Sequence, residues 1–488
     1  MKSPLIADCS ILTLAVALSR FLFRSRYLYD LDSVNFALAL DRFDVAVHQP
    51  HPPGYFLYVC LGRLFLPLFG DANSALVAIS ILASCGAVVA IYLLTDGWFG
   101  RRAAVASGLL FLFSPLGWFH GTVALTYIVE CFTSALVGHL CWQSYCGRKS
   151  FVVPSAVVLG LAAGLRPSSL LMLAPLWAFS ARKAGWRRMV WGLLALALVI
   201  AAWLIPMMLA SGGAARYWNA AQALWSNAAG SQNDTAGIVA MSLARFATIG
   251  LIFLLCLGAA APFLLAGPRL DSADTGKKLF TWVWVLPGLA FFTLVFLLFV
   301  NSGYLLVISP PAFAWIGARA AAWCSDARKA AIAVTLAAAN TAVYLWLPLY
   351  CSHRAVTKFE KELVSITTSI RKIALPGEYV IVGFDAHFLG FRHAAYYLPE
   401  FLTLGVPGPA SRILFSAQYR STSLVKQAPL DRFPKFVVFP HPPPHQYQKY
   451  LDQLRPRLRE GALQEEMIDG REFLVGDFRD LAPLFALP

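Results

Sequence analysis

Charge is scarce in this sequence. Only 14% of its 488 residues are Asp, Glu, Lys or Arg, while 58% are hydrophobic and the mean hydropathy is +0.62. Soluble domains carry about 25% charged and about 45–50% apolar residues, so a chain of this composition cannot hide its apolar surface in water. Several apolar runs approach the roughly 20 residues that a helix needs to cross a bilayer. We therefore expect a polytopic membrane protein.

Several chemical motifs are also missing. The sequence has no P-loop, GxSxG, HExxH or GxGxxG, so ATP-driven transport, serine hydrolysis, zinc proteolysis and dinucleotide chemistry all lack support. Its nine cysteines form no CxxC pair and lie mostly in apolar segments, which is typical of small buried hydrophobic residues. No A-x-A-type cleavage site follows the first apolar stretch, which we interpret as a membrane helix.

The apolar segments predict an all-α membrane domain of about 11–13 helices. The candidate spans are 5–23, 53–69, 74–95, 103–119, 126–146, 152–180, 187–210, 238–264, 279–300, 303–322 and 328–350. The span 152–180 is either one long helix or two short ones, because Arg166 and the helix-breaking Pro167 lie in its middle.

The sequence changes character after about residue 350. Charged residues return, and EYVIVGF (378–384), FPKFVVFP (433–440) and REFLVGDF (471–478) have the composition of short strands. We expect a transmembrane domain over 1–350 and a small extramembrane α/β domain over 351–488. The tail segment 383–401 mixes Asp, His and Arg at a spacing typical of no metal site, and HPPPH (441–445) is expected to be a loop.

The net charge of +14 comes mostly from short basic clusters between apolar runs. These clusters lie at 100–104, 181–188, 276–278 and 326–330. Such clusters mark cytoplasmic loops, and they can also hold anionic headgroups or phosphates. The C-terminal domain then lies on the opposite face of the membrane. However, the cluster at 100–104 falls outside if all of the first three spans cross, so either the rule fails there or one early segment does not cross.

Polar residues concentrate in the loop 24–52. Within it, DSVNFALALDRFD (32–44) has helical spacing, and its apolar side chains could lie flat on a membrane surface; a solvated loop with an interfacial helix is the plain alternative. Asp32 stands at the predicted start of this helix, where an aspartate can accept N-terminal amides as a cap. A carboxylate held rigidly at the membrane interface is also suited to act as a general base.

These residues resemble GT-C glycosyltransferases. Residues 32–36 read DSVNF and residues 51–58 read HPPGYFLY, similar to the D-S-x-E-F and H-P-P-G-Y-P-L-Y patterns of bacterial relatives of the protein O-mannosyltransferases (glycosyltransferase family 39-like). The sequence departs from these patterns at Asn35, in place of Glu, and at Phe56, in place of Pro. The lipid A aminoarabinose transferases are also similar, with an Asp-Glu pair and a K-P-P-L segment. The resemblance covers residues 1 to about 180.

The resemblance implies transfer of a sugar from a polyprenyl-phosphate donor to an acceptor hydroxyl, usually with inversion. Asp32 would be the general base. The acceptor would be a lipid, a glycan or a protein, and no nucleic acid is implied. Asn35 weakens the case for paired carboxylates and for a divalent cation, which prefers several oxygen ligands; a metal requirement is left open. We expect a bacterial inner (plasma) membrane protein whose active site and C-terminal domain face the periplasm.

Three residues are candidates for holding the donor phosphate. His51 replaces the lysine of the K-P-P-L pattern. Arg166 is isolated in an apolar segment, where burying it unpaired costs at least ~2.5 kcal/mol, so it is either functional, snorkelling or in a structural ion pair. Tyr304 belongs to NSGYLLVISPPAFAWIG (301–317), which resembles the G/R-Y-L-L-x-x-x-P segment of these enzymes, although interfacial tyrosines are common for other reasons.

A second acid is expected near the fourth helix. ALTY (124–127) stands where the lipid A enzymes carry A-L-T-D, so Tyr127 occupies the acid's position and Glu130 lies one turn later. Glu130 is either a second catalytic acid or the partner of an arginine in packing.

Three alternatives stay open. The chain could be a transporter or flippase of lipid-linked sugars, although no internal repeat favours this. It could also be a non-catalytic GT-C relative, which Asn35 suggests. The loop 211–237 could be a mobile lid or an interfacial helix anchored by Trp218 and Trp225.

Overall fold

The computed structural model describes residues 2–233, 237–263, 275–297, 301–324, 327–384, 386–406, 434–439, 463–468 and 471–477. The chain forms two compact units: the first comprises 1–25, 54–209 and 232–356, and the second comprises 26–53, 210–231 and 357–488. The domain boundary that we expected at 350–351 stays a prediction. Asp385 and the HPPPH segment lie outside the described residues.

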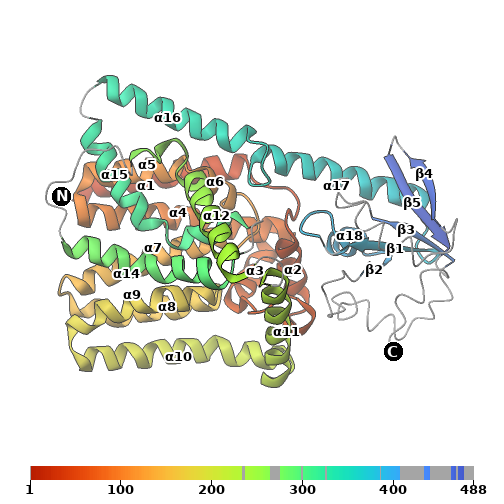
Figure 1. Ribbon diagram of the computed structural model, residues 1–488, viewed down its shortest axis with the longest axis horizontal. Helices are drawn as coiled ribbons and strands as arrows, with labels where there is room; N and C mark the ends of the chain where they lie inside the picture. The colour runs from red at the N-terminus through yellow and green to blue at the C-terminus, as the bar shows by residue number, and fades with distance from the viewer. Residues whose placement is uncertain are drawn as a thin grey trace. The chain divides into compact units, whose positions relative to one another are not determined.

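The first unit is built from helices (Figure 1). Its main helices are α1 (Lys2–Leu22), α3 (Phe56–Phe69), α4 (Ala72–Phe99), α5 (Arg101–Leu112), α6 (Pro115–His120), α7 (Tyr127–Tyr145), α8 (Val152–Leu165), α9 (Ser168–Ala181), α10 (Trp186–Ala210), α12 (Gly237–Leu257), α14 (Thr275–Ala290), α15 (Pro310–Trp323) and α16 (Ala327–Trp346). Among the described residues, five helices are long and apolar enough to cross a membrane. The predicted helical membrane fold is confirmed.

The predicted span 152–180 is two helices. α8 ends at Leu165 and α9 begins at Ser168, so the break falls on Arg166 and Pro167. The proline ring removes a backbone donor and disfavours helix in the residue before it, which explains a break at this point. Figure 1 shows α7, α8 and α9 side by side, and all three are in contact.

The contacts at the ends of the helices in the first unit bear on whether every segment before the basic cluster at 100–104 runs from one end of the bundle to the other. Arg101 at the start of α5 pairs with Asp8 near the start of α1, with Nε 2.6 Å from Oδ2. Asn73 at the start of α4 donates to the carbonyl of Ser25, just beyond α1, at 2.9 Å. α1 and α4 are therefore antiparallel, and α4 alone returns the chain to the end where α1 begins.

The short helix α3 stays near the opposite end of the bundle. Leu57 at its start contacts Gly164 at the end of α8, and α3 leads directly into the start of α4. α3 therefore does not run from one end of the bundle to the other. This arrangement favours the alternative in which an early segment does not cross, which stays a prediction.

Basic side chains gather where α1 begins. The Lys277 ammonium lies 5.1 Å from the ring centroid of Phe99, at the end of α4. The Lys183 ammonium lies 3.5 Å from the ring centroid of Tyr145, at the end of α7. We call this end of the first unit, marked by Arg101, Arg102, Lys183 and Lys277, the basic end.

Aromatic rings fill the interior of the first unit. Trp284 on α14 lies against Gly138 on α7, where a Cβ atom would collide with the indole ring. The indole N–H donates to the Ser134 hydroxyl at 3.0 Å. Phe280 packs edge-on against Trp142, with ring centroids 5.2 Å apart. Gly138 is thus needed for the close approach of α7 and α14.

The second unit contains a five-stranded sheet in the order β2-β1-β3-β5-β4. Its strands are β1 (Tyr379–Phe384), β2 (Leu402–Val406), β3 (Lys435–Val438), β4 (Leu463–Ile468) and β5 (Arg471–Asp477). β1 pairs in parallel with β2 and β3, whereas β5 is antiparallel to β3 and β4. The predicted strands correspond to β1, β3 and β5, while β2 and β4 were not predicted.

Helices complete the second unit. They are α2 (Leu31–Asp41), α11 (Ala214–Asn233), most of α17 (His353–Ile373) and α18 (Phe391–Tyr397). The loop 211–237 is helical over α11, as the interfacial alternative requires, and the choice between a lid and an interfacial helix stays a prediction. Trp218 and Trp225 on α11 are 67% and 49% exposed, as side chains that anchor a helix at an interface would be.

The environment predicted for α2 was wrong in two respects. We expected an amphipathic helix lying on a surface, but most of α2 is buried, including Val34 and Phe36. We also expected Asp32 to cap it, but the cap is Asp30, whose backbone is extended and whose carboxylate accepts the Asp32 N–H at 2.8 Å. Asp32 is therefore the second residue of the helix, and its own carboxylate is left for other contacts.

Candidate active site

Asp32 and His51 meet in the second unit. The Asp32 Oδ1 atom lies 3.3 Å from His51 Nδ1, and the two side chains are 23% and 14% exposed. Phe36, one turn further along α2, packs against the imidazole with ring centroids 5.8 Å apart. The carboxylate is thus oriented by neighbours yet open to a solute. A carboxylate in this setting can accept a proton from a hydroxyl group that reaches it.

Asn35 has a structural partner that the sequence did not predict. Its Oδ1 atom accepts a hydrogen bond of 2.6 Å from Nη1 of Arg392 on α18. The same nitrogen lies 3.3 Å from the carbonyl of His48. Both Asn35 and Arg392 are 2% exposed. The neutral amide, standing where the related patterns carry glutamate, thus ties α2 to α18 and to the loop before His51.

His48 is buried in this arrangement. Burial, together with the positive charge of Arg392 and the nearby His51, lowers the pKa of His48 well below its usual value. A neutral His48 keeps additional positive charge away from Asp32. His48 thus lies buried beside Arg392 in the loop that leads to His51.

Asp30 is a second carboxyl group close to Asp32. It is 6% exposed, and burial, reinforced by the charge of Asp32, raises its pKa to about 7, while His387 opposes the shift. A substantial fraction of Asp30 is therefore protonated at neutral pH. In this chain the second acid near Asp32 is Asp30, two residues before it. In the D-S-x-E-F pattern the second acid is the Glu three residues after the Asp.

Asp44 fixes the loop that carries His48 and His51. Its Oδ1 atom accepts the Ala46 N–H at 3.1 Å, and its Oδ2 atom lies 2.8 Å from Nη2 of Arg216 on α11. The Asp44 and Gln49 backbones also exchange two hydrogen bonds, of 2.6 and 3.0 Å. This network explains why a loop rich in proline reaches Asp32 in a defined orientation.

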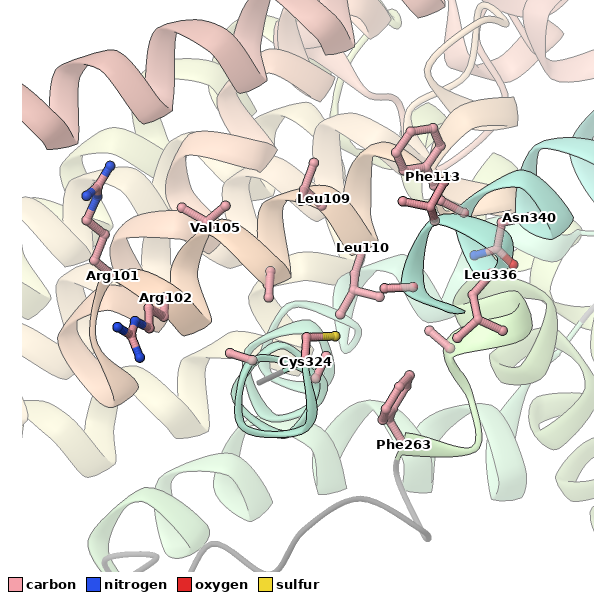
Figure 2. Close-up of a pocket in the computed structure, with 17 residues that line it drawn as sticks. Arg101, Arg102, Val105, Leu109, Leu110, Phe113, Phe263, Cys324, Leu336 and Asn340 are labelled. Atoms are coloured by element: carbon pink, nitrogen blue, oxygen red, sulfur yellow. The ribbon is translucent and has the colours of Figure 1, made fainter. Parts of the chain in front are cut away.

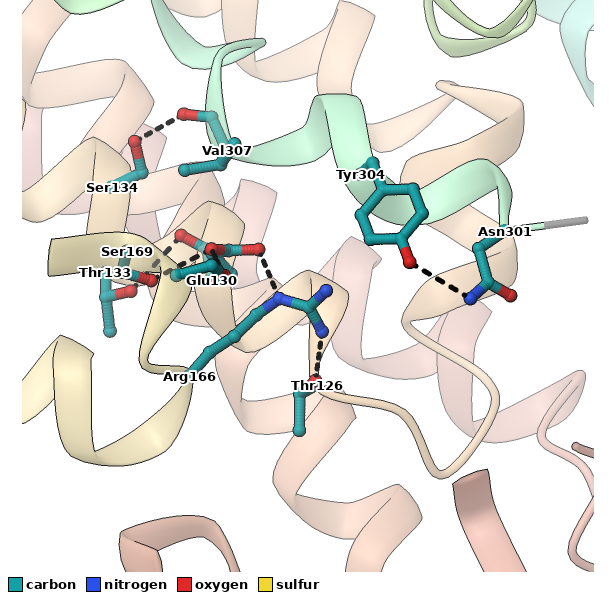
Figure 3. Close-up of polar contacts among 10 residues, drawn as sticks. Thr126, Glu130, Thr133, Ser134, Arg166, Ser169, Asn301, Tyr304 and Val307 are labelled. Carbon is teal, nitrogen blue, oxygen red and sulfur yellow. Dashed lines mark hydrogen bonds and ion pairs between the residues drawn. The ribbon is translucent and has the colours of Figure 1, made fainter. Parts of the chain in front are cut away.

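A buried ion pair lies in the first unit (Figure 3). Glu130, on the first turn of α7, places Oε2 2.7 Å from Nε of Arg166, and the side chains are 1% and 7% exposed. The other carboxylate oxygen, Oε1, accepts hydrogen bonds of 3.0 Å from the hydroxyls of Ser168 and Ser169. Arg166 also donates from Nη1 to the Thr126 hydroxyl at 2.7 Å. Both oxygens of Glu130 are thus engaged.

Tyrosine rings surround the Arg166 guanidinium. Its Cζ atom lies 4.2, 5.7 and 5.8 Å from the ring centroids of Tyr127, Tyr304 and Tyr55. Tyr127 and Tyr304 meet edge to face at 5.5 Å. Cation–π attraction to several rings helps to hold a desolvated arginine. The structure therefore brings together Tyr127, Glu130, Arg166 and Tyr304, which were predicted from separate segments.

Two features of this cluster are informative for binding. The Arg166 Nη2 atom makes no hydrogen bond with any residue that the structure describes. Gly303, next to Tyr304, lies directly against the Tyr127 ring, so no side chain fits at this position. The cluster thus holds one unused guanidinium nitrogen beside closely packed aromatic walls.

Some of these contacts were not predicted. Ser168 and Ser169 stand two and three residues after Arg166 in LRPSS, and that short spacing was a usable indication. Tyr55 belongs to the HPPGY segment, in which nothing indicates its contact with Arg166. Within the described part of the chain, no three His, Cys, Asp or Glu side chains gather in a way that could hold a metal ion. The metal requirement stays open.

Solved structures similar to this one define the fold. ArnT from Cupriavidus metallidurans bound to undecaprenyl phosphate aligns with a TM-score of 0.63 at 15% identity, over 98% of this chain and 99% of that chain. Apo ArnT gives 0.61 at 13% identity, over 100% and 99%. The chain therefore has the GT-C fold that we expected.

An archaeal protein shares the fold less closely. The oligosaccharyltransferase AglB from Archaeoglobus fulgidus, in complex with an inhibitory peptide and a dolichol-phosphate, aligns with a TM-score of 0.52 at 12% identity. The alignment covers 90% of this chain and 69% of that chain. At such low identity the likeness to ArnT and AglB shows a shared fold.

The sequence itself also matches a known family. Residues 42–188 match the family described as the protein O-mannosyl-transferase TMEM260 N-terminal domain. A comparison with curated proteins gives no match. The predicted resemblance to GT-C glycosyltransferases is confirmed, as is the class of enzyme, a glycosyltransferase. The roles of individual residues and the inverting mechanism stay predictions.

Proposed function

We propose that this protein transfers a sugar from a polyprenyl-phosphate donor to an acceptor hydroxyl, with Asp32 as the general base. The observation that carries the proposal is the Asp32 carboxylate, which is 23% exposed and held 3.3 Å from His51. The donor class is supported by two proteins of the same fold, ArnT bound to undecaprenyl phosphate and AglB in complex with dolichol-phosphate.

The proposed reaction is a single displacement. The Asp32 carboxylate takes the proton of the acceptor hydroxyl while the hydroxyl oxygen attacks the anomeric carbon of the sugar. The bond between that carbon and the donor phosphate oxygen breaks, and polyprenyl phosphate leaves with the electron pair. Attack on the face opposite the leaving group inverts the anomeric configuration. A positioned base contributes about 10²–10⁴-fold to such a step.

We assign the donor phosphate to Arg166. Two of its nitrogens are fixed by Glu130 and Thr126, at 2.7 Å each, which leaves Nη2 for a phosphate oxygen. Hydrogen bonds from arginine to phosphate are charge-assisted and therefore strong. Tyr127 and Tyr304 border the same guanidinium. The Nδ1 atom of His51 faces Asp32, and a role of His51 in holding the phosphate stays a prediction.

Glu130 suits a positioning role better than a catalytic one. Arg166 occupies one of its oxygens and two serine hydroxyls occupy the other, so neither is open to a substrate proton. Of the two roles that the sequence left open, pairing with an arginine is the one these contacts support. Glu130 then orients Arg166 and offsets its charge in an apolar setting.

The orientation in the membrane follows from the basic end. Clusters of Lys and Arg stay in the cytoplasm, so the basic end of the first unit faces inward. The chain leaves this unit after Ser25, Leu209 and Val356. Ser25 follows α1, Leu209 lies at the end of α10, and His353, close to Val356, packs against Phe23 at 5.1 Å. These exits lie opposite the basic end, which supports a periplasmic second unit in a bacterial inner membrane.

The acceptor hydroxyl belongs to a lipid, a glycan or a protein. The matched family is described as a protein O-mannosyl-transferase domain, and AglB was solved with an inhibitory peptide. Both favour a protein side chain as the acceptor.

A transfer assay tests the proposal. Purified protein is incubated with radiolabelled polyprenyl-phosphate sugars and membrane acceptors, using the wild type, Asp32→Asn and the control Asp41→Asn, which removes an exposed carboxylate at the other end of α2. We expect transfer by the wild type and the control and a loss of about 100-fold or more in Asp32→Asn. Transfer that survives Asp32→Asn contradicts the role of the base. Flipping of labelled lipid without transfer by the wild type would favour the transporter alternative.

A further inference from the structure

A pocket of about 650 Å³ lies in the first unit, away from the polar clusters described above (Figure 2). It is lined by α5, α15, α16 and the turn that follows α12. Its walls are almost entirely alkyl and phenyl groups, including those of Val105, Leu109, Leu110, Phe113, Phe263 and Leu336. The volume falls within the roughly 300–1,000 Å³ of typical small-molecule sites.

The polar groups of the pocket are placed unevenly. Figure 2 shows Arg101 and Arg102 at one end and Asn340 toward the other. The Asn340 amide is already used, since Oδ1 accepts the Ala259 N–H at 2.6 Å and Nδ2 donates to the Leu257 carbonyl at 3.3 Å. A ligand with a long apolar part and a charged head therefore fits with its head at the arginines.

The two arginines differ in availability. Arg101 is held by the Asp8 carboxylate through Nε at 2.6 Å and Nη2 at 2.8 Å. Arg102, one residue later, is exposed and forms no ion pair or hydrogen bond with the residues that the structure describes. The Arg102 guanidinium can thus bind an anion at one end of an apolar pocket.

We propose that this pocket binds an anionic glycerophospholipid of the cytoplasmic leaflet, with an acyl chain between α5, α15 and α16 and its phosphate at Arg102. The end of the pocket that Arg101 and Arg102 line belongs to the basic end, which the positive-inside rule places in the cytoplasm, where basic residues attract anionic lipids. The polyprenyl-phosphate donor is a poorer fit, because its phosphate is assigned to Arg166, near the opposite end of the same unit. The lipid site does not depend on the transfer reaction.

Lipid binding by the delipidated full-length protein tests this site. Thermal unfolding and native mass spectrometry are measured with added phosphatidylglycerol, phosphatidylcholine or undecaprenyl phosphate. A ligand at free concentration c that binds only the folded state stabilises it by RT ln(1 + c/Kd), so Tm rises once the ligand concentration exceeds Kd. We expect phosphatidylglycerol to raise Tm and to remain bound in the mass spectrometer, with a weaker effect of phosphatidylcholine. Equal binding of phosphatidylcholine, or displacement of phosphatidylglycerol by undecaprenyl phosphate, would overturn the proposal.

Two pairs of variants locate the site. Ala337→Trp fills the pocket, whereas Ala338→Trp places the same side chain on the exposed neighbouring position of α16. Phosphatidylglycerol should raise the Tm of Ala338→Trp and leave that of Ala337→Trp unchanged. Arg102→Gln should weaken the apparent affinity about fivefold, and Arg188→Gln, an equal change of charge outside the pocket, should leave it unchanged. If Ala337→Trp does not fold, the comparison of Arg102→Gln with Arg188→Gln tests the site. Equal affinities of these two variants for phosphatidylglycerol would contradict it.

Discussion

The buried ion pair between Glu130 and Arg166 can be tested through the stability of the protein. Glu130→Gln keeps the size of the side chain but leaves the guanidinium without its counter-charge. The Glu130 and Arg166 side chains are 1% and 7% exposed, so solvent cannot replace the lost partner. Breaking a buried pair in this way costs about 3–5 kcal/mol. We expect the lower part of this range, because Arg166 retains Thr126 and the Tyr127 ring.

A double-mutant cycle in detergent measures the coupling energy between Glu130 and Arg166. Glu130→Gln, Arg166→Gln and the double variant are compared with the wild type by thermal and denaturant unfolding. The double variant should be less destabilised than the sum of the single ones, with a coupling energy of about 1–3 kcal/mol, because no unpaired charge remains. Ser168→Ala is the matched control, since it removes one hydrogen bond to Oε1 and should cost about 0.5–1.5 kcal/mol. A coupling near zero would refute a buried ion pair.

Three further predictions concern stability. Burial raises the pKa of Asp30 to about 7, so the stability that its protonated form contributes is complete at low pH and is lost as the pH rises through 7. The Tm of the wild type should therefore fall relative to that of Asp30→Asn between about pH 4 and pH 7, and parallel curves would contradict this. Arg392→Met leaves the buried Asn35 oxygen without its donor and should cost about 1–3 kcal/mol in denaturant unfolding, where an unchanged midpoint would show that the contact contributes nothing. Gly138→Ala should cost about 1–3 kcal/mol by collision with Trp284, and Trp284→Leu in the same chain should recover part of the lost Tm; no recovery would point to another cause.

Much of the fold could be predicted from local patterns. Long apolar runs indicate the helices, and the pair Arg166-Pro167 indicates the break between α8 and α9 because proline cannot continue a helix. The strands β1 and β3 are apolar runs of a recognisable kind. β4, which reads LQEEMI, carries adjacent polar residues and lacks that pattern, so its place in the sheet depends on its pairing with β5.

The site was predictable where a motif is local. Asp32 and His51 stand in patterns that resemble a family, and an arginine isolated in an apolar segment is conspicuous. The link between Asn35 and Arg392 spans 357 residues, and nothing near either residue indicates the other. The exchange of roles between Asp30 and Asp32 has a different cause: both can cap a helix, and only the backbone conformation decides which one does.

The role of Asp32 is tested most directly by single-turnover transfer after donor binding has been measured separately. Asp32→Asn should bind the polyprenyl-phosphate donor with unchanged affinity, because the donor phosphate is assigned to Arg166. It should then transfer the sugar about 100-fold or more slowly than the wild type, since the proton of the acceptor hydroxyl has no base to receive it. Transfer by Asp32→Asn at the wild-type rate, or a loss of donor affinity with no loss of transfer rate, would contradict the assignment of Asp32 as the general base.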